Sequence, residues 1–164
     1  MHFRRGGIVL AILYAVGAPP GADAQTTTQG FQSEARVDGI IARTSSVQAG
    51  FGVTIPAGIY VRTGLVAGVG AGEHGLEGRT DLIARFSLDP FRQSRWAPYA
   101  GAGLTGRYRS TEAGGTRAYL LIFLGIEGPL RNQRSPGWVP AFELGLGGGA
   151  RIGVVLRRGI PDRR

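Results

Sequence analysis

The sequence predicts an all-β protein, an eight-stranded antiparallel up-and-down transmembrane β-barrel that follows a cleaved signal peptide. Three observations lead to this fold class. Apolar and polar residues alternate at a period of two, short turn sequences separate the alternating segments, and glycine crowds the polar side of the alternation. Successive side chains of a β-strand point to opposite faces, so each segment has one apolar and one polar face.

The first 24 residues have the layout of a secretory signal peptide. Arg4 and Arg5 precede an apolar run that begins at Ile8, and the small-x-small ending Ala22-Asp23-Ala24 follows a proline pair. We expect cleavage after Ala24, because the apolar run is far shorter than the roughly 20 residues of a spanning helix. The expected organisation is a signal peptide at 1–24, a flexible lead-in at 25–32, a barrel domain at 33–158 and a basic tail at 159–164.

The first half of the barrel domain contains four predicted strands. The segment 33–42 alternates only vaguely, whereas 47–55 is short and regular. In 59–71, small and branched apolar residues oppose a face that is rich in glycine. In 76–88, the sequence LEGRTDLIARFSL places its charged residues on one face and its apolar or small residues on the other. Each of these segments has the length and composition of a strand.

The second half adds four more strands, at 97–109, 117–128, 138–146 and 150–158. The longest apolar run of the mature chain, 118–126, is too short for a membrane helix but suits a tilted spanning strand of about 9 to 11 residues. Turn sequences separate the segments at 56–58, 72–75, 89–95, 110–115, 129–136 and 147–149. Short sequential connections predict antiparallel neighbours in up-and-down order.

The composition of the polar face favours a membrane barrel over a soluble one. A soluble sheet covers its wet face with threonine and long charged residues, but this face is crowded with glycine. Glycine fits a barrel of eight strands, whose interior is only just wide enough for side chains. Aromatic residues near the predicted strand ends are typical of the girdles of spanning barrels. They are Trp96, Tyr99, Tyr108, Trp138 and Phe142.

Charge and composition limit the possible partners. The net charge of +8 favours anionic partners, and for an exported chain these are lipid head groups rather than nucleic acid. The chain has no cysteine, so it has neither disulfides nor a thiolate metal site. We expect no metal and no cofactor.

The stretch WAPYAGAGLTG, residues 96–106, resembles the aromatic-x-Pro-Tyr-x-Gly-x-Gly strand opening of small outer-membrane β-barrel proteins of the OmpA and OmpX type. The resemblance covers about residues 45–158. It implies an eight-stranded barrel in the outer membrane of a Gram-negative bacterium. The chain departs from that pattern in its C-terminal VVLRRGIPDRR, which has no terminal aromatic, and in its short loops, which argue against a loop-borne adhesin.

The inward face predicted from the alternation carries both signs of charge. Buried charges persist when they are paired and hydrogen-bonded, so we expect a lumenal ionic network that plugs the barrel. Its expected members are Arg62, Glu77, Arg79, Asp81, Arg85, Glu127, Glu143 and Arg151, with Arg157 on the same face. Arg107, Arg109 and Arg117 flank one hairpin tip. They form either a candidate anion-binding rim for lipopolysaccharide phosphates or a simply hydrated rim.

No catalytic residue is assigned. Residues 101–106 match the dinucleotide pattern G-x-G-x-x-G, but that site needs a strand-turn-helix and the alternation here continues through the glycines. The leading hypothesis is a non-enzymatic outer-membrane protein with a structural or interaction role. One alternative is a soluble periplasmic barrel that binds an apolar ligand. The other is a lipid-modifying enzyme that uses His74 with Ser110 and Glu112.

Overall fold

A computed structural model describes residues 30–73, 75–89, 95–110, 115–129 and 137–158. The expected signal peptide and basic tail lie outside these residues, as does the expected lead-in except for its last three residues. None of the described residues belongs to a helix long and apolar enough to cross a membrane.

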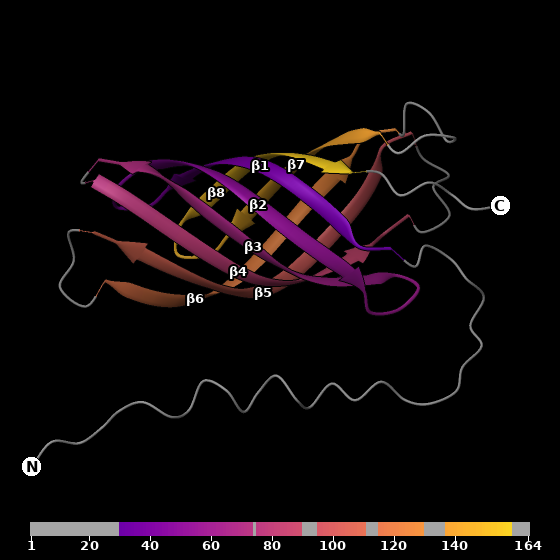
Figure 1. Ribbon diagram of the computed structural model, residues 1–164, viewed down its shortest axis with the longest axis horizontal. Helices are drawn as coiled ribbons and strands as arrows, with labels where there is room; N and C mark the ends of the chain where they lie inside the picture. Colours follow the sequence, from indigo (N-terminus) through magenta and orange to yellow (C-terminus); the bar gives the residue numbers. More distant parts are fainter. Residues whose placement is uncertain (1–29, 74, 90–94, 111–114, 130–136, 159–164) are drawn as a thin grey trace, which may run out of the picture.

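The described chain forms eight strands that close into one barrel (Figure 1). Each strand pairs antiparallel with the next, and β1 pairs antiparallel with β8 to close the sheet. The predicted eight-stranded up-and-down barrel is therefore confirmed. The strands are β1 (Gln32–Ile41), β2 (Ser46–Pro56), β3 (Val61–Gly72), β4 (Gly75–Ser87), β5 (Ala97–Arg109), β6 (Thr116–Glu127), β7 (Trp138–Leu146) and β8 (Ala150–Arg158).

The barrel has two unlike ends. The start of β1 and the end of β8 lie at one end, on the right in Figure 1, which we call the terminal end. The connections 42–45 and 147–149 lie at the opposite end, together with the ends of β3 and β5, and we call it the turn end. The β7–β8 turn is tight, and Gly148 adopts a φ of 69°, a conformation that glycine reaches without steric cost.

Side chains alternate between the outside and the lumen along every strand. On β6, Leu120 is 66% exposed and Leu124 60% exposed, whereas Leu121 and Phe123 between them are buried. On β8, Arg157 is only 1% exposed, although its neighbour Leu156 points outward. Large apolar side chains thus cover the outer face of the barrel, and most of the charged ones point inward.

Glycine allows the strands to coil tightly around a narrow lumen. At Gly64, Gly70 and Gly103, a Cβ atom would collide with a carbonyl oxygen of the adjacent strand. Only a residue without a side chain permits the backbones to approach so closely. This explains the glycine-rich inner face that the sequence showed.

Aromatic side chains gather mainly near the terminal end. Trp96, Trp138 and Phe142 are exposed there, and the rings of Trp96 and Phe142 lie 6.4 Å apart. Tyr108 is exposed near the turn end. The assignment of Tyr99 to the outer girdle is wrong: its side chain is 4% exposed and points into the lumen, because it shares the inward parity of β5 with Gly101.

Candidate functional site

The lumen holds the buried charged side chains of the described part of the chain. Six arginines and six carboxylates are buried there, so their formal charges cancel. The arginines are Arg36, Arg79, Arg85, Arg107, Arg151 and Arg157, and the acids are Glu34, Asp38, Glu77, Asp81, Glu127 and Glu143. Arg62 and Arg109 also point inward and are partly exposed.

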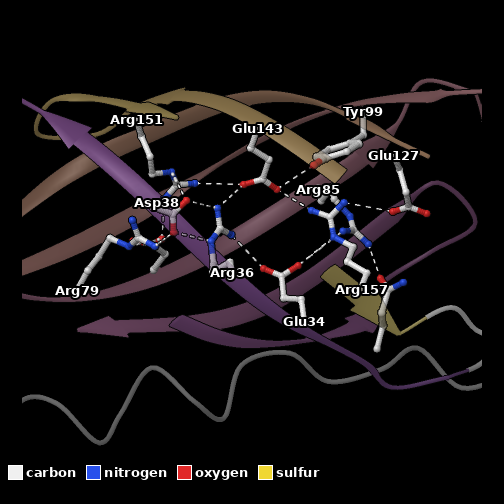
Figure 2. A network of polar contacts seen from close by, with 12 residues as sticks. Glu34, Arg36, Asp38, Arg79, Arg85, Tyr99, Glu127, Glu143, Arg151 and Arg157 are labelled. Atoms are coloured by element: carbon white, nitrogen blue, oxygen red, sulfur yellow. Dashed lines mark hydrogen bonds and ion pairs between the residues drawn. The ribbon is translucent and has the colours of Figure 1, made fainter. Parts of the chain in front are cut away.

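Arg36 of β1 lies at the centre of this network (Figure 2). Its guanidinium forms two hydrogen bonds to Asp38, of 2.7 and 2.9 Å, and one of 3.0 Å to Glu34 on the same strand. A fourth bond reaches Glu143 of β7, across the lumen. Fork-shaped contacts of this kind are the strongest that a guanidinium makes with carboxylates. Arg36 therefore links two walls of the barrel.

Arg157 of β8 forms a second centre, nearer the terminal end. Its three nitrogens contact Glu34 at 3.0 Å, Glu127 at 3.2 Å and Glu143 at 2.6 Å. The guanidinium also lies 4.5 Å from the centre of the Tyr99 ring, whose hydroxyl donates a 3.0 Å hydrogen bond to Glu143. Every donor nitrogen of Arg157 is engaged, and its charge is balanced by three acids.

A third group occupies the middle of the lumen and joins β1 to the opposite wall. Arg79 contacts Asp38 at 2.6 Å and Asp81 at 3.1 Å. Arg151 contacts Asp81 at 2.8 Å, and the hydroxyl of Thr105 donates a hydrogen bond to the same carboxylate. The two aspartates thus tie β1, β4, β5 and β8 together.

The three arginines of the predicted anion-binding rim lie in different environments. Arg107 and Arg109 both bind Glu77, at 2.8 and 2.9 Å. Arg107 also donates to the carbonyl of Gly148 and is buried. Arg117 lies directly opposite Arg107 on β6 and is exposed. Two of the three rim arginines therefore share one carboxylate inside the barrel.

Glycines opposite the charged side chains create the space that the network occupies. A Cβ on Gly50 would touch the Arg36 side chain, and one on Gly52 would touch Glu34. The same contact arises between Gly72 and Glu77. The narrow lumen accommodates these long side chains because the facing positions lack their own.

Glycines also make room for the aromatic rings of the lumen. The Tyr99 and Phe123 rings lie 6.5 Å apart in an edge-on arrangement. A Cβ on Gly101 would fall within the Phe123 ring, and one on Gly125 would collide with Tyr99. A small apolar cluster surrounds the two rings and fills the lumen between the ionic groups. Its other members are Val66, Ile83, Leu121, Ala141 and Val155.

The eight residues predicted from the sequence for the network all point inward, but they are not equally connected. Glu77, Arg79, Asp81, Glu127, Glu143 and Arg151 form ion pairs. Arg62 instead donates to the neutral oxygens of Gly30 and Thr54. Arg85 donates to Gln32 and comes no closer than 4.0 Å to a carboxylate.

Sequence reasoning missed Glu34, Arg36 and Asp38, which lie at the centre of the network. The signal was present, because these charged residues follow one another at a period of two within 33–42. The outward positions of β1 include Ser33, Ala35 and Gly39, which are too small or polar to mark a clear apolar face. Without that face the inward parity of β1 could not be assigned.

Metal-ligating and nucleophilic side chains are the other candidates for chemistry among the described residues. No group of three His, Asp or Glu residues among them is placed to hold a metal ion. His74 and Glu112, two members of the hypothetical catalytic group, lie outside the described residues, and Ser110 directly follows the end of β5 at the turn end. The described acids of the lumen are engaged chiefly with arginine, an arrangement suited to holding strands together.

Comparison with known proteins establishes the fold. No protein-family model matches the chain, and no curated protein matches its sequence. Among solved structures, a de novo designed transmembrane β-barrel aligns with a TM-score of 0.56 and 13% identity, over 82% of this chain and 98% of the design. Neisserial surface protein A (NspA) aligns with a TM-score of 0.57 and 14% identity, over 79% of this chain and 96% of NspA. At these identities the chain is similar to both proteins in fold alone.

Proposed function

We propose that this chain is a small outer-membrane β-barrel of the bacterial envelope whose outer face contacts lipid. The observation that carries the proposal is the distribution of side chains around a closed sheet. Leu120, Ile122 and Leu124 on β6 expose more than half of their surface, and every other strand also presents apolar side chains outward. A water-soluble protein rarely exposes a continuous apolar surface of this extent.

The dimensions of the barrel support the same placement. Its strands have 9 to 13 residues, and a tilted strand of about 9 to 11 residues crosses the hydrocarbon core of a bilayer. A closed sheet leaves no unpaired backbone edge, which is the condition for a β structure within lipid. The polar groups that lipid would exclude lie in the lumen.

We further propose that the protein has a structural or interaction role and does not act as an enzyme or a general pore. Six buried arginines and six buried carboxylates bridge the lumen, and the rings of Tyr99 and Phe123 fill part of the remaining space. Barrels of eight strands are just wide enough for such side chains. The network acts as a plug that also joins opposite walls.

The soluble periplasmic alternative is not retained. It required the Leu, Ile and Val residues to surround an apolar ligand inside the barrel. The structure places most of them outside, for example Leu144 and Ile152, and surrounds the lumen with charged groups. For the lipid-modifying alternative, the described residues provide no supporting geometry.

Outer-membrane lipids are the proposed partners, and lipopolysaccharide phosphates remain a proposal for the rim at the turn end. Arg117 is exposed there, and Arg109 retains partial exposure beside Glu77. Guanidinium groups bind phosphate oxygens in a forked geometry.

Fractionation and gel mobility test the proposal. We expect the protein to sediment with the outer membrane, to require detergent for extraction, and to migrate differently on a detergent gel before and after boiling. Vesicles that contain the folded protein should retain small hydrophilic solutes. Recovery of the folded protein in the soluble periplasmic fraction would overturn the membrane placement. Rapid leakage of solutes from the vesicles would overturn only the proposal that the ionic network blocks the lumen.

A further inference from the structure

Two arginines face each other on the inner wall at the terminal end. Arg62 of β3 is the register partner of Arg85 of β4, and both side chains belong to the inward set. Residues directly opposite in an antiparallel pair have Cβ atoms about 5 Å apart, and like charges at such positions repel each other. The sequence therefore places two positive charges where the pairing alone disfavours them.

Arg85 differs from the other buried arginines of the described chain. Arg36, Arg79, Arg107, Arg151 and Arg157 each have a carboxylate oxygen within 2.8 Å. For Arg85 the nearest is Glu34 Oε2, at 4.0 Å. Its Nη2 donates to the neutral Gln32 side chain at 2.6 Å, and its buried Nη1 donates no hydrogen bond. Arg85 is thus a buried cation without a close counter-charge.

Arg62 is also uncompensated. Its contacts are the carbonyl oxygens of Gly30 and Thr54 and the Thr54 hydroxyl, all of them neutral. None of the described residues forms an ion pair with it at the distances seen elsewhere in the lumen. Arg62 is partly exposed at the mouth, whereas Arg85 lies deeper and is 7% exposed. The pair therefore extends from the opening toward the interior.

The acids nearest to this pair already form ion pairs with other arginines. Glu34 binds Arg36 and Arg157, one through each carboxylate oxygen. Glu127, whose charge acts on both Arg62 and Arg85, binds Arg157 at 3.2 Å. Figure 2 shows Arg85 beside Arg157 and Tyr99, in the part of the network that also holds Glu127. A carboxylate could approach Arg85 closely only by leaving another arginine.

We propose that Arg62 and Arg85 form a binding site for a small oxyanion of the phosphate or carboxylate type, entering the lumen from the terminal end. Burial of an uncompensated guanidinium is costly, and an oxyanion would supply both the counter-charge and the acceptors. Arg62 provides donors at the mouth, and Arg85 Nη1 provides the unused donor deeper in the lumen. Exposed Arg95 at the same end raises the local concentration of anions.

This inference goes beyond the membrane placement, because it concerns the lumen and applies equally to the barrel in detergent. The test uses the full chain, folded in neutral detergent micelles, with inorganic phosphate and acetate as separate probes in titration calorimetry at constant ionic strength. We expect saturable binding of at least one probe, and the stronger binder identifies the oxyanion class. The double variant Arg62→Gln/Arg85→Gln should bind at least tenfold more weakly, whereas Arg158→Gln should stay within about twofold.

A second measurement uses stability in the absence of the anion. Removal of an uncompensated buried charge should not weaken the fold, so Arg85→Gln should unfold at the same denaturant concentration as the unaltered protein or a higher one. The bound anion should raise the unfolding midpoint of the unaltered protein but not that of Arg85→Gln. The proposal is overturned if neither probe binds the unaltered protein, if the double variant retains its affinity, or if Arg85→Gln is markedly destabilised without anion.

Discussion

Gly153 of β8 lies directly opposite Asp38 of β1, and the Asp38 carboxylate fills the space that a side chain on Gly153 would need. Asp38 in turn binds both Arg36 and Arg79. A position that looks like a simple strand glycine is therefore part of the ionic network. Its role is to leave room for a buried charge at the closure of the barrel.

Substitution of Gly153 by alanine should destabilise the barrel. The added methyl group would displace Asp38 from Arg36, and overpacking of this kind costs about 1 to 3 kcal/mol. The measurement is urea unfolding of the protein in lipid vesicles, followed by tryptophan fluorescence. The matched control is Gly39→Ala on the outer face of β1, where a Cβ would meet no atom closer than 3.9 Å. Equal effects of the two variants would contradict the steric argument.

Removal of the Arg157 guanidinium should be among the most damaging changes in the lumen. Arg157→Met would leave Glu34, Glu127 and Glu143 with fewer positive partners. Breaking a buried ion pair on one side costs about 3 to 5 kcal/mol. The adjacent exposed residue provides the control, because Arg158→Met should change the free energy of unfolding by less than about 0.5 kcal/mol. An unchanged midpoint for Arg157→Met would show that its ion pairs do not stabilise the barrel.

An arginine on the outer face should oppose insertion into lipid. Ile122→Arg and Leu120→Arg each place a charge on the exposed face of β6, and the expected cost near the bilayer centre is about 2 to 4 kcal/mol. Thr116→Arg, at the end of the same outward row, should cost less than about 1 kcal/mol because it lies near the interface. Folding into vesicles at graded urea concentrations measures the difference. Normal folding of all three variants would contradict the proposed lipid contact.

Replacement of the glycines that make room for the lumenal aromatic rings should also destabilise the barrel. Gly101→Ala would force Phe123 to move, and we expect a loss of about 1 to 3 kcal/mol in unfolding free energy. Gly106→Ala on the same strand points outward, where a Cβ would meet no atom closer than 3.8 Å, and should be nearly neutral. Combining Gly101→Ala with Phe123→Leu should restore part of the loss, because the smaller side chain vacates the contested space. Absence of any recovery would argue against a direct clash.

Much of the fold could be predicted because the outer face and the lumen of the barrel hold apolar and charged side chains in alternation. The predicted bounds of 97–109, 138–146 and 150–158 agree with β5, β7 and β8. The other strands differ by up to two residues at their ends, because alternating residues no longer point to two opposite faces once the chain enters a turn. β1 begins at Gln32, inside the expected lead-in, because its side chain points into the lumen and is buried.

The pairings within the lumen could not be predicted from the sequence. Alternation assigns a face to a residue but does not say which residue across the barrel it meets. Arg36 and Glu143 are 107 positions apart and come together only through closure of the sheet. Tyr99 shows a second limit, because an aromatic residue near a strand end suits either an outer girdle or a lumenal hydrogen bond to Glu143. The parity of β5 decides between the two.

The antiparallel pairing of β1 with β8 makes closure of the barrel depend on two strands that lie far apart in the sequence. Until β8 is available, β1 and β7 each present a row of unpaired backbone groups, which a bilayer does not tolerate and which other chains can bind. We expect a chain that lacks β8 to aggregate or be degraded, because its sheet cannot close. The sheet can therefore close only in a polypeptide that contains both β1 and β8.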